Sequence, residues 1–403
     1  MVGILEILMA LMLGVLTGVL TGLTPGIHIN LVSVLVLSFS PALLLITSPI
    51  VLAVYIISLA ITHTFLDALP SIYLGAPDEA QALNVLPGHR LLKKGEGHNA
   101  IVYTVIGSLG SLLLGMILFP FFITSMDFIF PYVKKVMGYL LLLIMVYMIL
   151  RCTGKRLESL VIFLISGVLG LLVLTGLSLH QPLFPLLSGL FGISTLVSSL
   201  LQKSVIPKQD LHKPLTLSRK NTVKSVSAAT GVGFIAAFLP GFGSSQAAIL
   251  ATNVVGDIGD EGFLSLVGGI NTANMLISIA TAYALDKARN GAIVVVKDLI
   301  DAIGFQEMML FLGIALVAGG LASILTLLLS KTFATFIVKV PYEKITWGII
   351  SFILLLTFFF DGFLGFIILL TATAMGLVCS FWGVAKNHLM GCLILPVILF
   401  FLL

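Results

Sequence analysis

Polar side chains interrupt two long apolar segments of the sequence. His63 and Asp67 stand four residues apart, so on a helix they would share one face and could contact each other or a common partner. A histidine beside a carboxylate can carry a proton near neutral pH, and ionisable residues inside apolar segments mark ion pathways. Asn271 and Asn274 interrupt another apolar segment and suit a cation or a substrate hydrogen bond. These four residues are candidates for ion coupling, the alternative for Asp67 being a local cap near Pro70.

A Pro-Gly pair recurs in two similar apolar stretches. Pro25-Gly26 lies in GVLTGVLTGLTPGIHINLVSVLVL and Pro240-Gly241 in TGVGFIAAFLPGFGSSQAAILATN, at an offset of 215 residues. Proline removes a backbone donor and glycine adopts conformations that a helix does not use, so each pair should end one helix and let another begin. The alternative is an ordinary turn at the membrane surface. The recurrence of the pair favours two equivalent breaks in a duplicated chain.

A helix that begins at such a break presents free N–H groups and the positive end of its dipole, which together attract an anion. Irregular backbone at membrane depth is tolerated where it is buried in protein or faces a cavity. Serine and threonine in membrane helices also bond their own backbone, which is the alternative for the hydroxyls near each break. We expect a shared substrate site formed by Thr24, Pro25, Gly26, His28 and Asn30 with Pro240, Gly241, Gly243, Ser244, Ser245 and Gln246.

The composition requires a membrane protein. The 403 residues include 21 Lys+Arg and 17 Asp+Glu, so charged residues make up 9%, while hydrophobic residues make up 59%. Mean hydropathy is +1.19. At roughly 20 residues per spanning helix, the chain allows about ten to twelve membrane segments and no sizeable soluble domain. Soluble enzymes and nucleic-acid-binding modules are therefore excluded, and we expect a multi-pass protein of the cell membrane.

A basic segment divides the chain into three parts. Residues 202–224 hold six of the 21 basic residues and one acid, so they are predicted to form a cytoplasmic linker. Residues 1–201 and 225–403 are predicted to form two membrane repeats. The expected spans are 2–23, 49–69, 99–123, 132–150, 158–179 and 182–201, then 225–239, 263–285, 307–338, 345–360, 363–380 and 389–403, with a turn at Asp361.

The linker leaves and re-enters the membrane on one side, so inverted copies must each cross it an odd number of times. The fold class we expect is an all-α polytopic membrane protein with two inverted-topology repeats. Broken or re-entrant helices would lie at the paired Pro-Gly motifs, an arrangement used by secondary transporters.

The segments LTGLTPGIHIN and AAFLPGFGSSQA resemble the two Pro-Gly signatures of the TctA-like permeases, the large membrane subunit of tripartite tricarboxylate transporters. Residues 73–100, YLGAPDEAQALNVLPGHRLLKKGEGHNA, resemble a loop of the same family. The resemblance implies uptake of carboxylates such as citrate, with a small membrane subunit and an extracytoplasmic solute-binding protein as partners. His28 and Asn30 depart from the small and hydroxyl residues expected after the first Pro-Gly, and the chain is shorter than the usual large subunit.

No enzyme signature is present: the sequence lacks His-Glu-x-x-His, a Walker motif and Cys-x-x-Cys. The three cysteines are far apart, and the acidic run at Asp257, Asp260 and Glu261 is typical of a solvated turn, so we expect no metal site and no cofactor.

We predict a secondary transporter for a small organic anion, coupled to H⁺ or Na⁺. The alternatives are a flippase for a polyprenyl-type lipid phosphate and, further off, an intramembrane enzyme or scaffold. Membrane lipids are the expected surroundings, and a homo-oligomer remains open.

Overall fold

The computed structural model describes residues 3–24, 29–76, 79–201, 207–238, 243–286, 288, 290–300, 302–337 and 342–403. Within these ranges the chain is helical and forms no strand. Seven described helices are long and apolar enough to cross a membrane: Ile4–Leu23, Pro49–Leu74, Gly97–Ile117, Arg156–Gly176, Gly259–Ala284, Phe305–Phe336 and Thr346–Phe381. The expected all-α, multi-pass membrane protein is confirmed, whereas the inverted relation of its halves stays a prediction.

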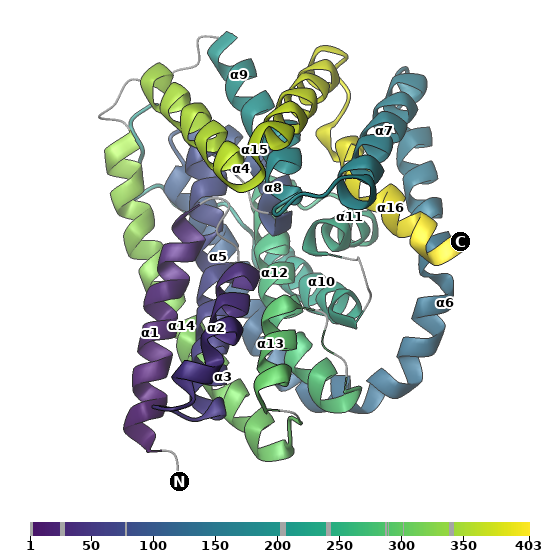
Figure 1. The fold of residues 1–403 in the computed structure, drawn as a ribbon. Coiled ribbons are helices and arrows are strands. Elements are labelled where there is room, and N and C mark those ends of the chain that lie inside the picture. The colour runs from purple at the N-terminus through teal and green to yellow at the C-terminus, as the bar shows by residue number, and fades with distance from the viewer. Residues whose placement is uncertain are drawn as a thin grey trace.

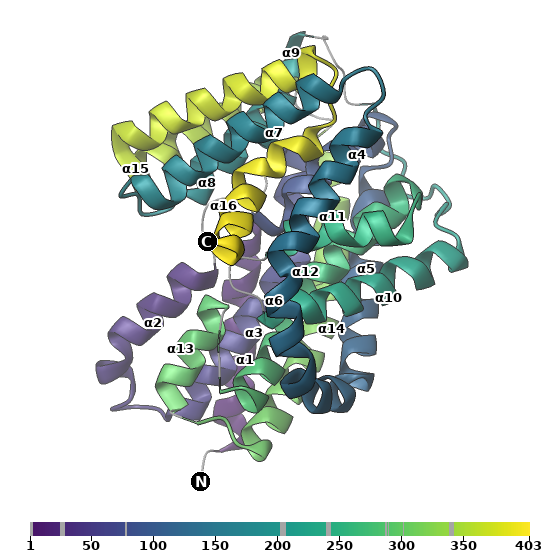
Figure 2. The ribbon, with the colours of Figure 1, turned by 90° about the vertical axis from the view of Figure 1, so that its right-hand side faces the viewer.

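The first half of the chain contains α1 (Ile4–Leu23), α2 (Ile29–Leu43), α3 (Pro49–Leu66), η1 (Pro70–Leu74), η2 (Glu79–Asn84), α4 (Val85–Lys93), α5 (Gly97–Ile117), α6 (Phe119–Arg151), α7 (Arg156–Leu171), η3 (Leu172–Gly176), α8 (Leu183–Leu187), η4 (Ser188–Ile193) and α9 (Ser194–Leu201). The second half contains α10 (Arg219–Phe238), α11 (Ser244–Val255), α12 (Gly259–Ala284), α13 (Gly291–Ile300), α14 (Phe305–Ile337), α15 (Tyr342–Phe381), η5 (Lys386–Met390) and α16 (Gly391–Leu402). Helices α15, α8 and α7 gather at one end of the molecule, and the N-terminus lies at the other (Figures 1 and 2).

A helix ends before each Pro-Gly pair and another begins after it, as predicted. Helix α1 ends at Leu23 and α2 begins at Ile29, while α10 ends at Phe238 and α11 begins at Ser244. The offset of 215 residues that relates the two Pro-Gly pairs also relates both ends of α1 to those of α10, and the start of α2 to that of α11. Pro25, Gly26, His28, Pro240 and Gly241 themselves lie outside the described residues.

Helices α3 and α12 form the centre of the membrane-spanning part. In α3, all residues from 51 to 66 except Tyr55 are buried, and α12 is buried over most of its length. The two helices contact each other, and each is covered by a helix from the opposite half: α5 packs on α12, and α14 packs on α3. Helix α1 packs on α3 just as α10 packs on α12. The two halves are therefore interlocked through reciprocal contacts.

Small residues permit the closest of these contacts. A Cβ added to Gly107 of α5 would collide with the backbone oxygen of Ser265, and one added to Gly268 of α12 would lie 2.6 Å from the Thr104 oxygen. Larger side chains would hold the two helices apart, so these glycines set the α5–α12 distance.

The expected turn at Asp361 is present as a kink within α15. Gly362 adopts φ 60°, a left-handed conformation that favours glycine, and α15 changes direction there (Figure 1). The Asp361 carboxylate accepts hydrogen bonds from the backbone N–H groups of His180 and Gln181, at 2.7 and 2.9 Å. Asp361 thereby joins this kink to the chain leading into α8.

Residues 207–218 of the predicted linker pack on the α4–α5 connection, whereas residues 219–224 form the first turns of α10. The Gln209 side chain accepts a hydrogen bond from the Gly97 N–H at 2.8 Å, and Lys213 pairs with Glu96 at 2.6 Å. The linker therefore lies at the end of the molecule that also carries Arg90, Lys93 and Lys94, as expected if these basic residues share one side of the membrane.

Candidate functional site

The Asp67 carboxylate is buried where the two halves meet. Asp67 is 3% exposed and follows the last residue of α3. Its Oδ1 accepts a hydrogen bond from Gln81 Nε2 of η2 at 2.8 Å, and its Oδ2 accepts one from Asn271 Nδ2 of α12 at 2.6 Å. Asn84 donates in turn to Gln81 Oε1. Neutral amides from both halves thus surround a buried acid, and each amide can offer an oxygen to a cation if it rotates.

The neighbouring residues of α3 extend this polar region to other helices. His63 Nδ1 lies 3.0 Å from Thr21 Oγ1 of α1, and Thr64 Oγ1 lies 3.1 Å from Thr272 Oγ1 of α12. His63 thus contacts α1, and the Asp67 carboxylate contacts η2 and α12. One face of α3 therefore carries a polar strip that links α1, η2 and α12.

The remaining described candidates of the first half are Thr24 and Asn30. The Thr24 hydroxyl donates to Leu20 O of its own helix at 2.8 Å, which is the local bonding considered as the alternative for such hydroxyls. Asn30 lies on α2 against Gly291 of α13. Helix α2 packs on α3 and α13.

In the second half, Gly243 precedes α11, and Ser244 and Ser245 are buried in its first turn, with Gln246 following in the same helix. Helix α11 packs on α10 and α12. Asn274 is half-buried on α12, at the contact with Gly233 of α10. The shared anion site at the two breaks stays a prediction, because its Pro-Gly members lie outside the described residues.

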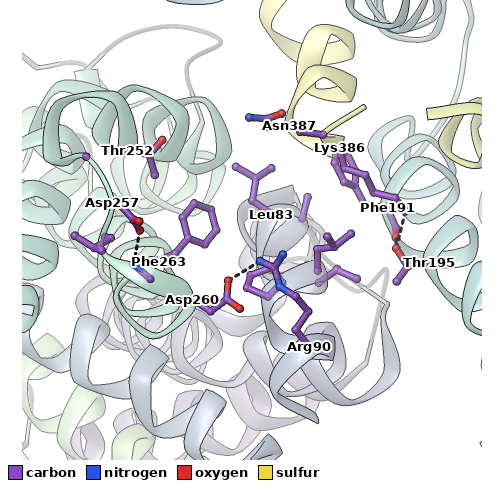
Figure 3. Close-up of a pocket in the computed structure, with 18 residues that line it drawn as sticks. Leu83, Arg90, Phe191, Thr195, Thr252, Asp257, Asp260, Phe263, Lys386 and Asn387 are labelled. Carbon is purple, nitrogen blue, oxygen red and sulfur yellow. Dashed lines mark hydrogen bonds and ion pairs between the residues drawn. The ribbon is translucent and has the colours of Figure 1, made fainter. Parts of the chain in front are cut away.

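A cavity of about 490 Å³ lies beside the Asp67 network, between the two halves (Figure 3). The first half contributes η2, α4 and the η4–α9 helix, and the second contributes the α11–α12 connection and η5. Leu83 lines the cavity and lies in η2 between Gln81 and Asn84, so one short helix borders both features. In Figure 3, Asp257 and Asp260 lie on the wall opposite Lys386 and Thr195.

Charges on the two walls of the cavity are held differently. Arg90 pairs with Asp260 at 2.5 Å. Lys386 instead donates to the hydroxyls of Ser194 and Thr195, at 2.8 and 2.6 Å. Burial lowers the pKa of Lys386 to about 8, because removal from water disfavours the ammonium form.

Sequence reasoning missed Gln81, Asn84 and Lys386 as site residues. Gln81 and Asn84 lie three apart in the segment 73–100, and that helical spacing was their one available signal. Lys386 was interpreted only as a mark of membrane topology, since its hydroxyl partners lie more than 190 residues away in the chain. Within the described ranges, no group of three or more His, Cys, Asp or Glu residues is placed to hold a metal ion.

Known proteins match nearly the whole chain. Residues 8–391 match the family described as the tripartite tricarboxylate transporter TctA family. An uncharacterized protein of Methanocaldococcus jannaschii, MJ1079, is 28% identical over 356 residues, which cover 86% of this chain and 88% of that protein. No solved structure matches. Because the family match covers the two Pro-Gly segments, the Asp67 network and the cavity, the chain belongs to the TctA family of tripartite tricarboxylate transporters.

Proposed function

We propose that this protein is the substrate-translocating membrane subunit of a secondary transporter for small carboxylates, with Asp67 as the residue that binds the coupling cation. Its family indicates a component of a transporter that also has other subunits and a substrate-binding protein. The observation that carries the proposal is the buried Asp67 carboxylate, held by Gln81 and Asn271 from opposite halves of the chain. An ionisable side chain buried inside a membrane protein is by default a functional-site candidate, and this one is held from both halves.

Cation binding would act on the contacts between the halves. When Asp67 binds H⁺ or Na⁺, its carboxylate would give up the hydrogen bond from Asn271. The Asn271 side chain could then turn its oxygen toward the cation. Because Asn271 belongs to α12 and Asp67 to α3, this exchange changes a contact between the two central helices. An alternating-access cycle needs such a link between ion occupancy and the arrangement of two bundles.

One relation supports inverted repeats as the frame of this cycle. Helices α5 and α14, which the offset of 215 residues relates approximately, each cover the central helix of the opposite half. A two-fold relation between halves makes such contacts reciprocal. In this frame, the substrate would bind at the starts of α2 and α11, beside Asn30, Ser244 and Ser245, because the first N–H groups of a helix have no acceptor within it and attract an anion.

The family's association with tricarboxylates favours a carboxylate over a lipid phosphate as substrate. The test is uptake of labelled citrate or succinate into proteoliposomes under an imposed Na⁺ or pH gradient. Wild-type protein should accumulate the anion. Asp67→Asn should lose gradient-driven accumulation, because an amide cannot hold the cation by charge. The variant should still fold, since its oxygen keeps one of the two hydrogen bonds and its NH2 group can donate to the other amide once that amide turns its oxygen toward it.

Asp298→Asn is the matched control, since Asp298 is an exposed carboxylate on α13, and it should accumulate the anion at the wild-type level. Gradient-driven uptake by Asp67→Asn equal to that of the control would show that coupling resides elsewhere.

A further inference from the structure

The ammonium group of Lys386 meets only neutral groups in the described part of the chain. Its two hydrogen-bond acceptors are the Ser194 and Thr195 hydroxyls, and no described carboxylate lies within ion-pair distance. These hydroxyls donate their own protons to the backbone oxygens of Leu190 and Phe191. Their lone pairs are therefore turned toward Lys386. An ammonium has three donors, so one is available to the cavity.

The acids on the opposite wall are already engaged. Asp260 accepts from Arg90, and Asp257 accepts from the Gly259 N–H at 3.0 Å. Arg90 has five N–H donors and uses one of them on Asp260. The cavity therefore has an uncompensated cation on one wall and a guanidinium with spare donors on the other. Leu83, Phe191 and Phe263 supply apolar walls between them.

We propose that this cavity binds a small di- or tricarboxylate, with one carboxylate on Lys386 and another near Arg90. The choice of a carboxylate rests on the proposed function, whereas the need for an anion rests on Lys386 alone. A charged hydrogen bond from an ammonium to a carboxylate is stronger than one to a hydroxyl, so the anion improves on the present contacts. Because the basic linker and Arg90 lie at the same end of the molecule, the cavity is a binding station on the linker side, distinct from the helix starts after the Pro-Gly pairs.

The probe is succinate. Lysines of the purified full-length protein are reductively methylated in carboxylate-free buffer, with and without succinate, and the methylation of each lysine is measured by mass spectrometry. Succinate at about ten times its dissociation constant should slow methylation of Lys386 about tenfold. Methylation of Lys344, an exposed lysine at the start of α15, should not change. Direct titration should give a dissociation constant that Lys386→Met weakens at least about tenfold, Lys386→Arg largely retains, and Lys344→Met leaves unchanged.

If succinate does not slow the methylation of Lys386 in the wild-type protein, the inference is overturned, whether or not the variants fold. Inorganic phosphate that protects Lys386 as well as succinate does would overturn the assignment of a carboxylate. The proposed function is tested separately by uptake. If the protein shows gradient-driven uptake but succinate does not slow the methylation of Lys386, the transport proposal is supported and the cavity site is rejected. If succinate slows the methylation of Lys386 but no gradient drives uptake, the cavity site is supported and secondary transport is rejected.

Discussion

At the scale of single residues, Asp67 depends on donors that come from separate parts of the chain. Asn271 supplies an amide hydrogen bond to it, at 2.6 Å, and is itself buried. Removing a donor from a buried carboxylate leaves part of its desolvation uncompensated, at a cost of about 1–3 kcal/mol. We therefore expect Asn271→Ala to lower the free energy of unfolding by this amount, measured by denaturant or thermal unfolding in detergent.

Asn274→Ala is the control for helix propensity, since Asn274 lies on the same helix and is not among the amides that donate to Asp67. A loss of stability that is the same in both variants would mean that the Asn271 amide contributes nothing specific to the Asp67 site.

Lys386 also predicts how carboxylate binding depends on pH. With the pKa of Lys386 lowered to about 8, the charged fraction falls about tenfold between pH 7 and pH 9. Succinate stays fully ionised over this range, so its dissociation constant should rise about tenfold as the ammonium loses its proton. Other titratable or charged groups interact with Lys386 or line the same cavity: Cys379, His89, Arg90, Asp257 and Asp260.

The Lys386→Arg variant separates Lys386 from these neighbours, because a guanidinium stays charged throughout the range. Burial, with the nearby Lys93 and Lys386, lowers the pKa of His89 to about 4, so His89 remains neutral from pH 7 to 9. Isothermal titration at several pH values should show the tenfold rise in the wild-type protein and little change in the Lys386→Arg variant. An equal rise in both proteins would assign the pH dependence to another group.

At the scale of helices, the contact between α5 and α12 should be intolerant of added volume. A Cβ at Gly107 would overlap the backbone oxygen of Ser265, which cannot rotate away as a side chain can. Gly107→Ala should therefore destabilise the protein by roughly 1–3 kcal/mol through forced separation of the two helices. Gly313→Ala on α14 is the matched control, because nothing lies within 4 Å of its added Cβ.

The control should be neutral or slightly stabilising, since alanine favours a helix over glycine by about 1 kcal/mol. Unfolding temperatures in one detergent would compare the two variants. Equal stability of Gly107→Ala and Gly313→Ala would show that α5 and α12 do not approach as closely as the structure has them.

Sequence periodicity predicted most spans but not all of their shapes. The segments 99–123 and 132–150 were expected as separate spans with Pro131 between them, yet α6 runs from Phe119 to Arg151 through that proline. Proline is tolerated inside membrane helices, so its position does not by itself locate a helix end. The segment 182–201 was expected as one span and is divided into α8, the π-helical η4 and α9. The hydropathy of a segment does not depend on whether its backbone is α-helical or π-helical, so hydropathy could not predict this division.

The candidate site was predictable only where polar residues interrupt apolar segments. His63, Asp67 and Asn271 were recognised in this way. Gln81 escaped notice because it lies in a segment of mixed polarity, where a polar residue is not unusual. Its role depends on a hydrogen bond to Asp67 made by the fold of η1 and η2, and no local pattern encodes that contact.

At the scale of the whole molecule, the two halves are joined by a linker that is itself packed. The Thr216 N–H and hydroxyl both contact the Tyr103 hydroxyl at 3.0 Å, and the Thr216 hydroxyl contacts Glu261. The linker therefore contacts α5 of the first half and α12 of the second at one end of both helices. This placement makes the linker a fixed part of the basic end of the molecule, which also carries the Lys386 cavity.

The positive-inside rule then predicts the side of the membrane on which this end lies. A cysteine at Ser218, exposed in the linker, should resist an impermeant maleimide in intact cells and react after the cells are opened. A cysteine at Ile46, which is 83% exposed in the turn between α2 and α3, should react in intact cells, because α3 runs from that turn toward Asp67 and the basic end. Native Cys152 is replaced by serine in both proteins, since it is the cysteine of the chain that is not buried. Ready labelling at position 218 in intact cells, with protection at 46, would reverse the orientation and place the Lys386 cavity on the outer side.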